Sequence, residues 1–232
     1  PHRLVEYTGK VRRGKEWDAF QADQAPDAVI VNAREYAYAR AIAAALRSHP
    51  IAAPILFSDG AVHEEEIMWD HEGRRCSSRP DARNPDVMIA DLKTCRSAQP
   101  ERFIREATWA RHHAQVRFYD YADAADTGRQ VYDPRTGKGD RIDLYVVAIE
   151  TAAPHVCTVF ALDDTAIVAA DRAIATWWAR LVACEAENAW HGYRQGVEQF
   201  TCDDPENFIS GGVLDAAEND NSTGADAEDW SA

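Results

Sequence analysis

Two acidic residues and a lysine restrict what this chain can fold into. Asp81 follows an Arg-Pro pair, and after nine intervening residues the chain reads Asp91-Leu92-Lys93. Residues two apart on a strand point to the same face, roughly 6.6 Å apart along it, so Asp91 and Lys93 share one face. We expect the fold to bring Asp81 to the same face. Two carboxylates held close together bind a hard cation such as Mg²⁺. The cation and the ammonium together can orient and acidify a water molecule beside a phosphodiester.

The charge of the chain is unevenly distributed. A formal net charge of −14 at first argues against a nucleic-acid partner. Residues 1–120, however, hold 18 Lys and Arg against 18 Asp and Glu, whereas residues 203–232 hold nine acidic residues and no Lys or Arg. A neutral body with an acidic tail can still present a locally basic groove, so net charge does not exclude nucleic acid.

The composition is that of a globular domain in a reducing compartment. No apolar stretch approaches the roughly 20 residues that a membrane span needs, and no secretory signal is visible, so we expect no membrane partner. The five cysteines form no Cys-x-x-Cys pair, which favours reduced thiols and a cytoplasmic location. The length is enough for one domain with a substantial core.

The pattern of apolar residues and turn formers predicts strands flanked by helices. Strands are predicted at about 61–69, 74–80, 87–93, 142–149 and 156–162. Helices are predicted at about 35–47, 101–122 and 165–188. We therefore predict an α/β domain with a mixed sheet over residues 1–214. Residues 215–232, which are acidic and poor in apolar side chains, are predicted to form a disordered tail.

A second polar motif lies downstream of the first. Gln115 and Tyr119 are four residues apart in the predicted helix 101–122, so their side chains share one face. We expect this helix to follow the strand of Asp91 and Lys93 directly and to aim both polar groups at the end of that strand. Alone, such a spacing is typical of a solvated helix surface. Together with the two carboxylates and the lysine, it indicates a functional site.

With these motifs the chain resembles the PD-(D/E)xK nuclease superfamily, and more narrowly its RecB-like branch, to which Gln-x-x-x-Tyr belongs. Further segments resemble the exonuclease VIII type of phage exonuclease, namely Glu64, Trp69-Asp70, Gly73 and Trp190-His191-Gly192-Tyr193. The resemblance covers roughly residues 5–200. It implies a restriction-endonuclease-like core, in which helices flank a central mixed β-sheet.

The resemblance also implies an activity and a site. The activity would be Mg²⁺-dependent or Mn²⁺-dependent exonucleolytic hydrolysis of linear double-stranded DNA, 5′ to 3′, in phage-type recombination. Lys93 would orient the water or stabilise charge in the transition state. The metal would be held by Asp81, Asp91, the carbonyl of Leu92 and Glu64. The DNA would be held by Arg79, Gln115 and Tyr119. The implied partners are DNA ends, a single-strand annealing protein and further copies of the same chain.

Several alternatives stay open at this stage. Glu64 and Glu66 would share a strand face, and the spacing to Trp69 favours Glu64 as the additional acid. The family also has a Gly-x-x-x-His motif, which this sequence lacks, and we expect it to lie upstream of Pro1. The chain could instead be another RecB-like nuclease, of the repair or CRISPR-associated kind, or a non-catalytic DNA-binding module on the same fold.

Deleting residues 215–232 should leave the melting temperature unchanged, because the segment lacks the apolar residues that a packed contact requires. Its negative charge opposes the approach of DNA, so the truncated protein should bind DNA slightly more tightly at low salt. The gain should shrink as salt screens the charge. Calorimetry and DNA titrations at low and high salt check both effects. A truncated protein that misfolds, or binds more weakly at low salt, would contradict the prediction.

Overall fold

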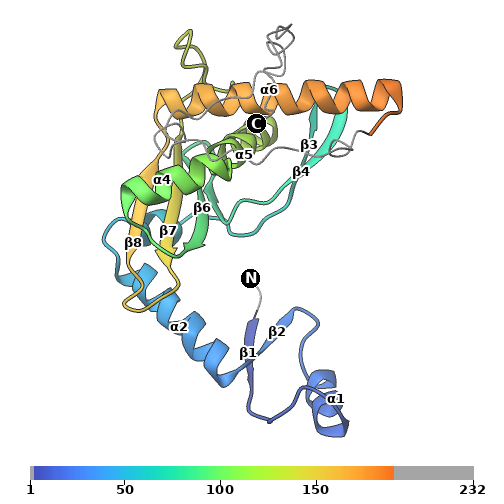
Figure 1. Ribbon diagram of the computed structural model, residues 1–232, viewed down its shortest axis with the longest axis vertical. Coiled ribbons are helices and arrows are strands. Elements are labelled where there is room, and N and C mark those ends of the chain that lie inside the picture. Colours follow the sequence, from blue (N-terminus) through green and yellow to red (C-terminus); the bar gives the residue numbers. More distant parts are fainter. Residues whose placement is uncertain (1–2, 191–232) are drawn as a thin grey trace, which may run out of the picture. The chain divides into compact units, whose positions relative to one another are not determined.

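The computed structural model describes residues 3–190 (Figure 1). Its strands are β1 (Arg3–Tyr7), β2 (Ala28–Asn32), β3 (Ile67–His71), β4 (Arg74–Ser78), β5 (Ala82–Asn84), β6 (Met88–Cys95), β7 (Asp143–Glu150) and β8 (Cys157–Ala161). Its helices are α1 (Lys15–Ala22), α2 (Ala33–Ser48), α3 (Ala52–Leu56), α4 (Pro100–Trp109), α5 (His112–Thr127) and α6 (Asp164–Glu187). The predicted tail 215–232 and the segment 191–193 lie outside the described residues. No helix within residues 3–190 has the length and apolarity needed to cross a bilayer.

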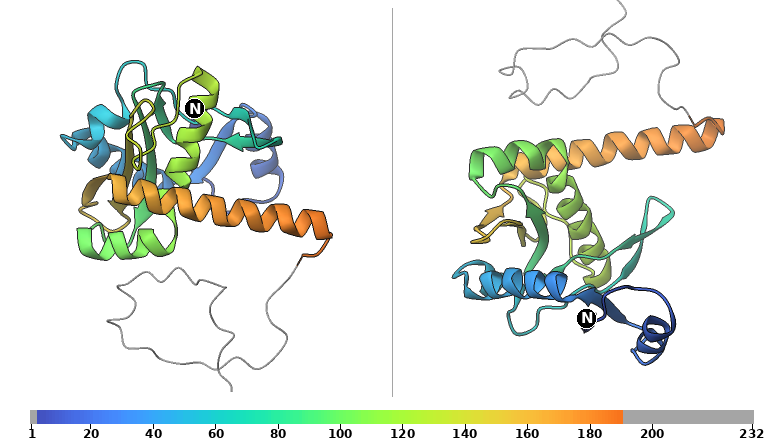
Figure 2. Two further views of the ribbon diagram at one scale, coloured as in Figure 1. Left: turned by 90° about the horizontal axis from the view of Figure 1, so that it is seen from above. Right: turned by 60° about the horizontal axis from the view of Figure 1, so that its bottom comes forward.

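The central sheet is mixed, as predicted. Its strand order is β5-β6-β7-β8, with β6 and β7 parallel and the two outer pairs antiparallel. Alternate residues of β6 point to opposite faces. Ile89 packs with Phe103 of α4 and Val116 of α5, whereas Met88 packs with Leu46 of α2. The strands therefore lie between α2 and α3 on one side and α4 to α6 on the other (Figure 2). The α/β fold with helices on both faces of a mixed sheet is confirmed.

Local signals in the sequence account for several helix ends. Asn32 and Glu35 form a reciprocal capping box at the start of α2, in which each side chain accepts a hydrogen bond from the other residue's backbone N–H at 2.8 Å. Asp163 caps α6 by accepting a hydrogen bond from the N–H of Ala166. These contacts satisfy backbone donors that a helix start otherwise leaves unpaired.

The predicted strand 61–69 is wrong in its first half. The chain there makes one isolated bridge, between Val62 and Arg83, and β3 begins only at Ile67. Glu64 has a φ of 53°, in the left-handed region, which interrupts an extended strand. The pattern of alternating residues carries no trace of this conformation.

The predicted single helix 101–122 is two helices. Arg111 has a φ of 61° and separates α4 from α5. The apolar spacing that predicted one helix continues across the break through Ala107, Ala110 and Ala114. Hydrophobic periodicity therefore could not reveal it. Strand β5 and the elements β1 and α1 were not predicted either.

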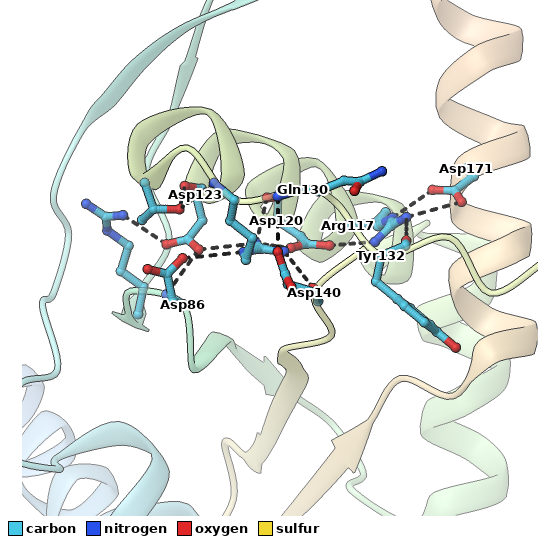
Figure 3. A network of polar contacts seen from close by, with 11 residues as sticks. Asp86, Arg117, Asp120, Asp123, Gln130, Tyr132, Asp140 and Asp171 are labelled. Carbon is cyan, nitrogen blue, oxygen red and sulfur yellow. Dashed lines mark hydrogen bonds and ion pairs between the residues drawn. The ribbon is translucent and has the colours of Figure 1, made fainter. Parts of the chain in front are cut away.

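A network of buried charges holds α5 in place (Figure 3). Arg117 bonds to Asp120 at 2.5 Å, to Asp171 of α6 at 2.7 Å and to the carbonyl of Tyr132 at 2.6 Å. Arg129, which follows the end of α5, pairs with Asp120 and with Asp123. One helix is thus tied to α6 and to the loop that precedes β7.

The network also reaches the sheet. Arg83 of β5 donates to Asp123 at 3.0 Å and to Asp126 at 2.8 Å, and both carboxylates belong to α5. Asp123 is fully buried and serves both Arg83 and Arg129. A buried charge is costly unless it is paired, so each member depends on its partners.

Replacing Asp123 with alanine should destabilise the protein by about 3–5 kcal/mol, because Arg83 and Arg129 lose a shared buried partner. Asp126→Ala is the matched control. Its carboxylate also pairs with Arg83 but is 45% exposed, so its loss should cost less than about 1 kcal/mol. Urea denaturation of the three proteins measures the difference. Equal stabilities of the two variants would contradict the account of the network.

Candidate active site

Strand pairing brings Asp81 and Asp91 together. In the antiparallel register of β5 and β6, Ala82 lies opposite Ala90, so Asp81 and Asp91 occupy the next pair of positions. The backbone N–H of Leu92 donates to Oδ2 of Asp81 at 2.5 Å and fixes that carboxylate. Two acids that are ten residues apart in the sequence thus adjoin because β5 turns back into β6.

Asp91 is the most buried of the predicted site residues, with 2% of its surface exposed. Its Oδ2 lies 2.6 Å from Nζ of Lys93, which supplies the balancing charge. The same oxygen makes no hydrogen bond of good geometry within the described part of the chain. A buried carboxylate oxygen with unused lone pairs is suited to a further cation.

Lys93 leads from the carboxylates to α5. Its Nζ donates to Oε1 of Gln115 at 2.9 Å, and Nε2 of Gln115 donates to the hydroxyl of Tyr119 at 2.8 Å. The i,i+4 motif therefore faces the strand, although α5 is the second helix after β6 because α4 intervenes. The prediction that Gln115 lies on the helix directly following the strand is wrong in that respect.

Glu64 lies at the edge of this group. Its backbone N–H donates to the carbonyl of Pro80, and its side chain pairs with Nε of Arg79 at 3.2 Å. Glu66 instead accepts a hydrogen bond from the hydroxyl of Ser77. Because residues 64–66 precede β3, the premise that Glu64 and Glu66 share a strand face is wrong. The structure places Glu64 beside Pro80, next to Asp81.

The environment of Asp81 disfavours its ionised form. The pKa of Asp81 is raised to about 6, chiefly by burial and in smaller part by the negative charges of Asp91 and Glu64. The hydrogen bond from Leu92 and the charge of Lys93 oppose the shift. A carboxyl group in such surroundings gains from a cation that offsets the neighbouring acids.

The pKa values of Tyr119 and His112 are also shifted by burial and by the charges of the site. Burial raises the pKa of Tyr119, and the carboxylates add to the rise, whereas the hydrogen bond from Gln115 lowers it. His112, at the start of α5, is half-buried against Phe103. Burial lowers the pKa of His112, and the ammonium of Lys93 lowers it further. His112 lies three residues before Gln115. The break between α4 and α5 places it at the start of α5, near Lys93.

The donor set fits a hard divalent cation. Asp81 and Asp91 supply carboxylate oxygens, and the resemblance adds the carbonyl of Leu92. Within residues 3–190, no three His, Cys, Asp or Glu side chains gather closely enough to hold a metal ion unaided. Two carboxylates, one of which has a buried oxygen that accepts no hydrogen bond within the described residues, suit a cation that keeps water molecules among its ligands, as Mg²⁺ does.

A separate hollow lies between β3, α5 and α6. Its volume is about 910 Å³, and Trp69, His71, Tyr121 and Trp178 are among its lining residues. It contains none of the predicted site residues. The candidate site lies apart from this hollow, at the end of the β5–β6 pair.

Comparison with solved structures identifies the class of fold. A provisionally designated exonuclease from Eubacterium rectale superposes with a TM-score of 0.53 at 11% identity, covering 78% of this chain and 71% of that one. An alkaline exonuclease from Laribacter hongkongensis matches at 19% identity over 56% of this chain and 62% of that one, but its TM-score of 0.29 is too low to support an argument. No curated protein matches the sequence. At such identities the first match shows a shared fold, that of a nuclease-like α/β domain.

The family follows from the sequence model. Residues 14–201 match the model of the PDDEXK-like domain of unknown function DUF3799, and the chain belongs to this family. The predicted membership of the PD-(D/E)xK superfamily is therefore confirmed.

The pKa of Asp81 has a consequence for stability. Since the folded pKa of about 6 exceeds the ordinary value of 3.8, the folded protein binds more protons than the unfolded chain between those pH values. The unfolding free energy of the metal-free protein should therefore fall as the pH rises from 4 to 7, by about 1–2 kcal/mol for this partly exposed group. Asp81→Asn should remove the fall while still accepting the hydrogen bond from Leu92.

Urea denaturation at several pH values, with a chelator present, measures this effect. Asp70→Asn, a change on an exposed position of β3, is the control and should keep the pH dependence of the parent. If Asp81→Asn also kept it, the carboxyl group would not titrate near pH 6.

Proposed function

We propose that this chain is a metal-dependent DNA exonuclease that hydrolyses phosphodiester bonds of linear double-stranded DNA. The observation that carries the proposal is the contact series Asp91–Lys93–Gln115–Tyr119 beside Asp81. Membership of a PDDEXK-like family and the fold shared with an exonuclease support it. The 5′ to 3′ direction and a role in phage-type recombination rest on the sequence resemblance, and the proposed cytoplasmic setting rests on the cysteine pattern.

The cation would be held by Asp81, Asp91 and the carbonyl of Leu92, with Glu64 as a further acid. When bound, Mg²⁺ or Mn²⁺ would polarise the phosphate and acidify a water molecule. Because the pKa of Asp81 is raised to about 6, a fraction of the molecules carries a proton on this carboxyl group near pH 6. Entry of the cation would displace that proton, so both acids would then be available as ligands.

Lys93 is placed to act on the reacting groups. An ammonium has three N–H donors. One is donated to Gln115 at 2.9 Å, and the ammonium also lies 2.6 Å from Oδ2 of Asp91 as an ion pair, which leaves N–H donors for a water molecule or a phosphate oxygen. Because Asp91 and Gln115 fix the ammonium in advance, little reorganisation is needed when charge develops on the phosphate.

Gln115 and Tyr119 would position rather than react. The amide of Gln115 accepts from Lys93 and donates to Tyr119, so it fixes the ammonium relative to α5. The hydroxyl of Tyr119 can donate to a phosphate oxygen of the substrate. Arg79, 59% exposed and paired with Glu64, can exchange that partner for a phosphate as DNA arrives.

The proposed partners follow from the same function. DNA ends would be the substrate, and a single-strand annealing protein would receive the single strand that resection leaves. Association into a homo-oligomer would keep the enzyme on its DNA. A repair or CRISPR-associated nuclease of the same branch is the nearest alternative function.

Lys93→Ala should reduce cleavage of end-labelled linear duplex by about 10²–10³-fold, because one preorganised electrostatic group is lost. Binding of the same duplex should change little, since phosphate contacts elsewhere remain. The assay uses Mg²⁺ or Mn²⁺ with a chelator control, and closed circular DNA tests the need for ends. Lys138→Ala, in the loop before β7, is a control that should cleave as the parent does.

The outcome separates the alternatives. Retention of most activity by Lys93→Ala would refute the role of the lysine. A parent protein that binds DNA but cleaves none with either metal would favour a non-catalytic DNA-binding module on this fold.

A further inference from the structure

A groove lies between β1 and α2, away from the candidate active site. Its volume is about 580 Å³, and it is lined by Leu4 and by the α2 residues Tyr36, Ala39, Arg40, Ala43, Ala44 and Arg47. Positions 36, 40, 43 and 47 recur at spacings of four, three and four, so they form one stripe along the helix. This stripe differs from the face that places Leu46 in the core. Among residues 3–190 the groove is therefore an open surface that packing leaves uncovered.

Two arginines stand along this groove without an acidic partner. Many arginines of the chain are ion-paired, as Arg12, Arg74 and Arg141 are. Arg40 and Arg47 instead lie over aromatic rings, 6.0 Å from the ring centre of Tyr36 and 5.0 Å from that of Phe57. No carboxylate within residues 3–190 pairs with either guanidinium. In a chain with a net charge of −14, two exposed unpaired arginines on one stripe point to an anionic partner.

The spacing of the two arginines suits a polyanion with a regular repeat. The two arginines are seven positions apart in the helix, which corresponds to about 10.5 Å along the helix axis. The phosphates of one DNA strand advance by about 3.4 Å per nucleotide, so three steps match that distance. A neighbouring aromatic ring restricts the motion of each guanidinium and so lowers the entropy lost when it binds a phosphate.

The floor between the arginines allows a close approach. Ala39, Ala43 and Ala44 project little from the helix. Residues 1–50 hold eight Lys and Arg against six Asp and Glu, and are thus slightly basic within an acidic protein. A backbone strand with phosphates on one side and sugars on the other fits a groove with cations on its rim and apolar atoms on its floor.

We propose that the groove between β1 and α2 binds the sugar-phosphate backbone of DNA, as a second contact region distinct from the site of hydrolysis. This rests on the proposed nuclease function. Helix α2 packs on Met88 and Ala90. Asp91 and Lys93 lie on the other face of β6, the face that also carries Ile89. The groove and the carboxylates therefore belong to opposite faces of the sheet. The groove holds a length of DNA that is not being cut.

The test is the double variant Arg40→Ala/Arg47→Ala in the full chain. DNA binding is measured with a fluorescently labelled linear duplex, in a chelator, over a series of salt concentrations. Loss of two phosphate contacts should lower the slope of log K against log salt by about 1.8. Arg40→Lys/Arg47→Lys should keep the slope of the parent, because it keeps both charges. The control Arg172→Ala/Arg180→Ala removes two exposed arginines from α6 and should also keep it.

A second readout concerns hydrolysis. With Mg²⁺ present, the double alanine variant should show a raised KM and an unchanged kcat on long duplex. On a duplex too short to reach the groove, it should match the parent in both constants. Melting temperatures of all variants establish that they fold.

The failures of the two proposals are distinguishable. If the parent cleaves DNA and the alanine variant keeps the salt slope of the parent, the groove proposal falls and the nuclease stands. If the parent cleaves nothing but the variant loses the slope, the groove stands and the nuclease falls. If the variant instead changes the sedimentation mass of the free protein at an unchanged slope, the groove is a contact between copies of the chain, and the proposal is overturned.

Discussion

The shared burial of Asp123 between Arg83 and Arg129 is the constraint on which the arrangement of α5 depends. Each arginine is almost fully enclosed, and neither can lose this carboxylate without leaving a charge unpaired in a medium of low polarity. Arg83 comes from the strand that follows Asp81, and Arg129 comes from the end of α5. The requirement to neutralise these charges therefore fixes the helix against the β5–β6 pair. That pair is also what juxtaposes the two carboxylates of the candidate site.

Helix α5 therefore has two polar faces, one directed to the candidate site and one buried in the charge network. Gln115 and Tyr119 look toward Lys93, while Arg117, Asp120 and Asp123 are enclosed in the charge network. The amide of Gln115 reaches the ammonium at 2.9 Å only while the rotation and position of the helix are held. Hydrophobic packing alone, through Val116, is non-directional and allows small rotations. Directional ion pairs on the second face remove that freedom.

The sequence was sufficient for those parts of the structure that depend on local chemistry. Asn32 and Glu35 encode a helix start that the structure realises, and the apolar run before Glu150 encodes a central strand. The motif of Asp81, Asp91 and Lys93 is compact enough in sequence that one strand pairing joins it. Features set by distant contacts were not predictable. The left-handed conformations of Glu64 and Arg111 split a strand and a helix whose apolar spacing ran on without interruption.

The charge network lay beyond prediction for the same reason. The sequence around Arg83 does not indicate its partners, because Asp123 and Asp126 lie some 40 residues away. The choice of Glu64 over Glu66 rested on a spacing, whereas the structure separates them by what each touches, Arg79 in one case and Ser77 in the other. The roles of these acids in catalysis remain the proposal made above.

The bond between Arg117 and Asp171 gives the fold an unusual mechanical linkage. Arg117 lies between Gln115 and Tyr119 in sequence, and Asp171 belongs to α6, 54 residues further along the chain. Helix α6 thus braces α5, and a displacement of α6 would act on Arg117 and so on the helix that presents Gln115 to Lys93.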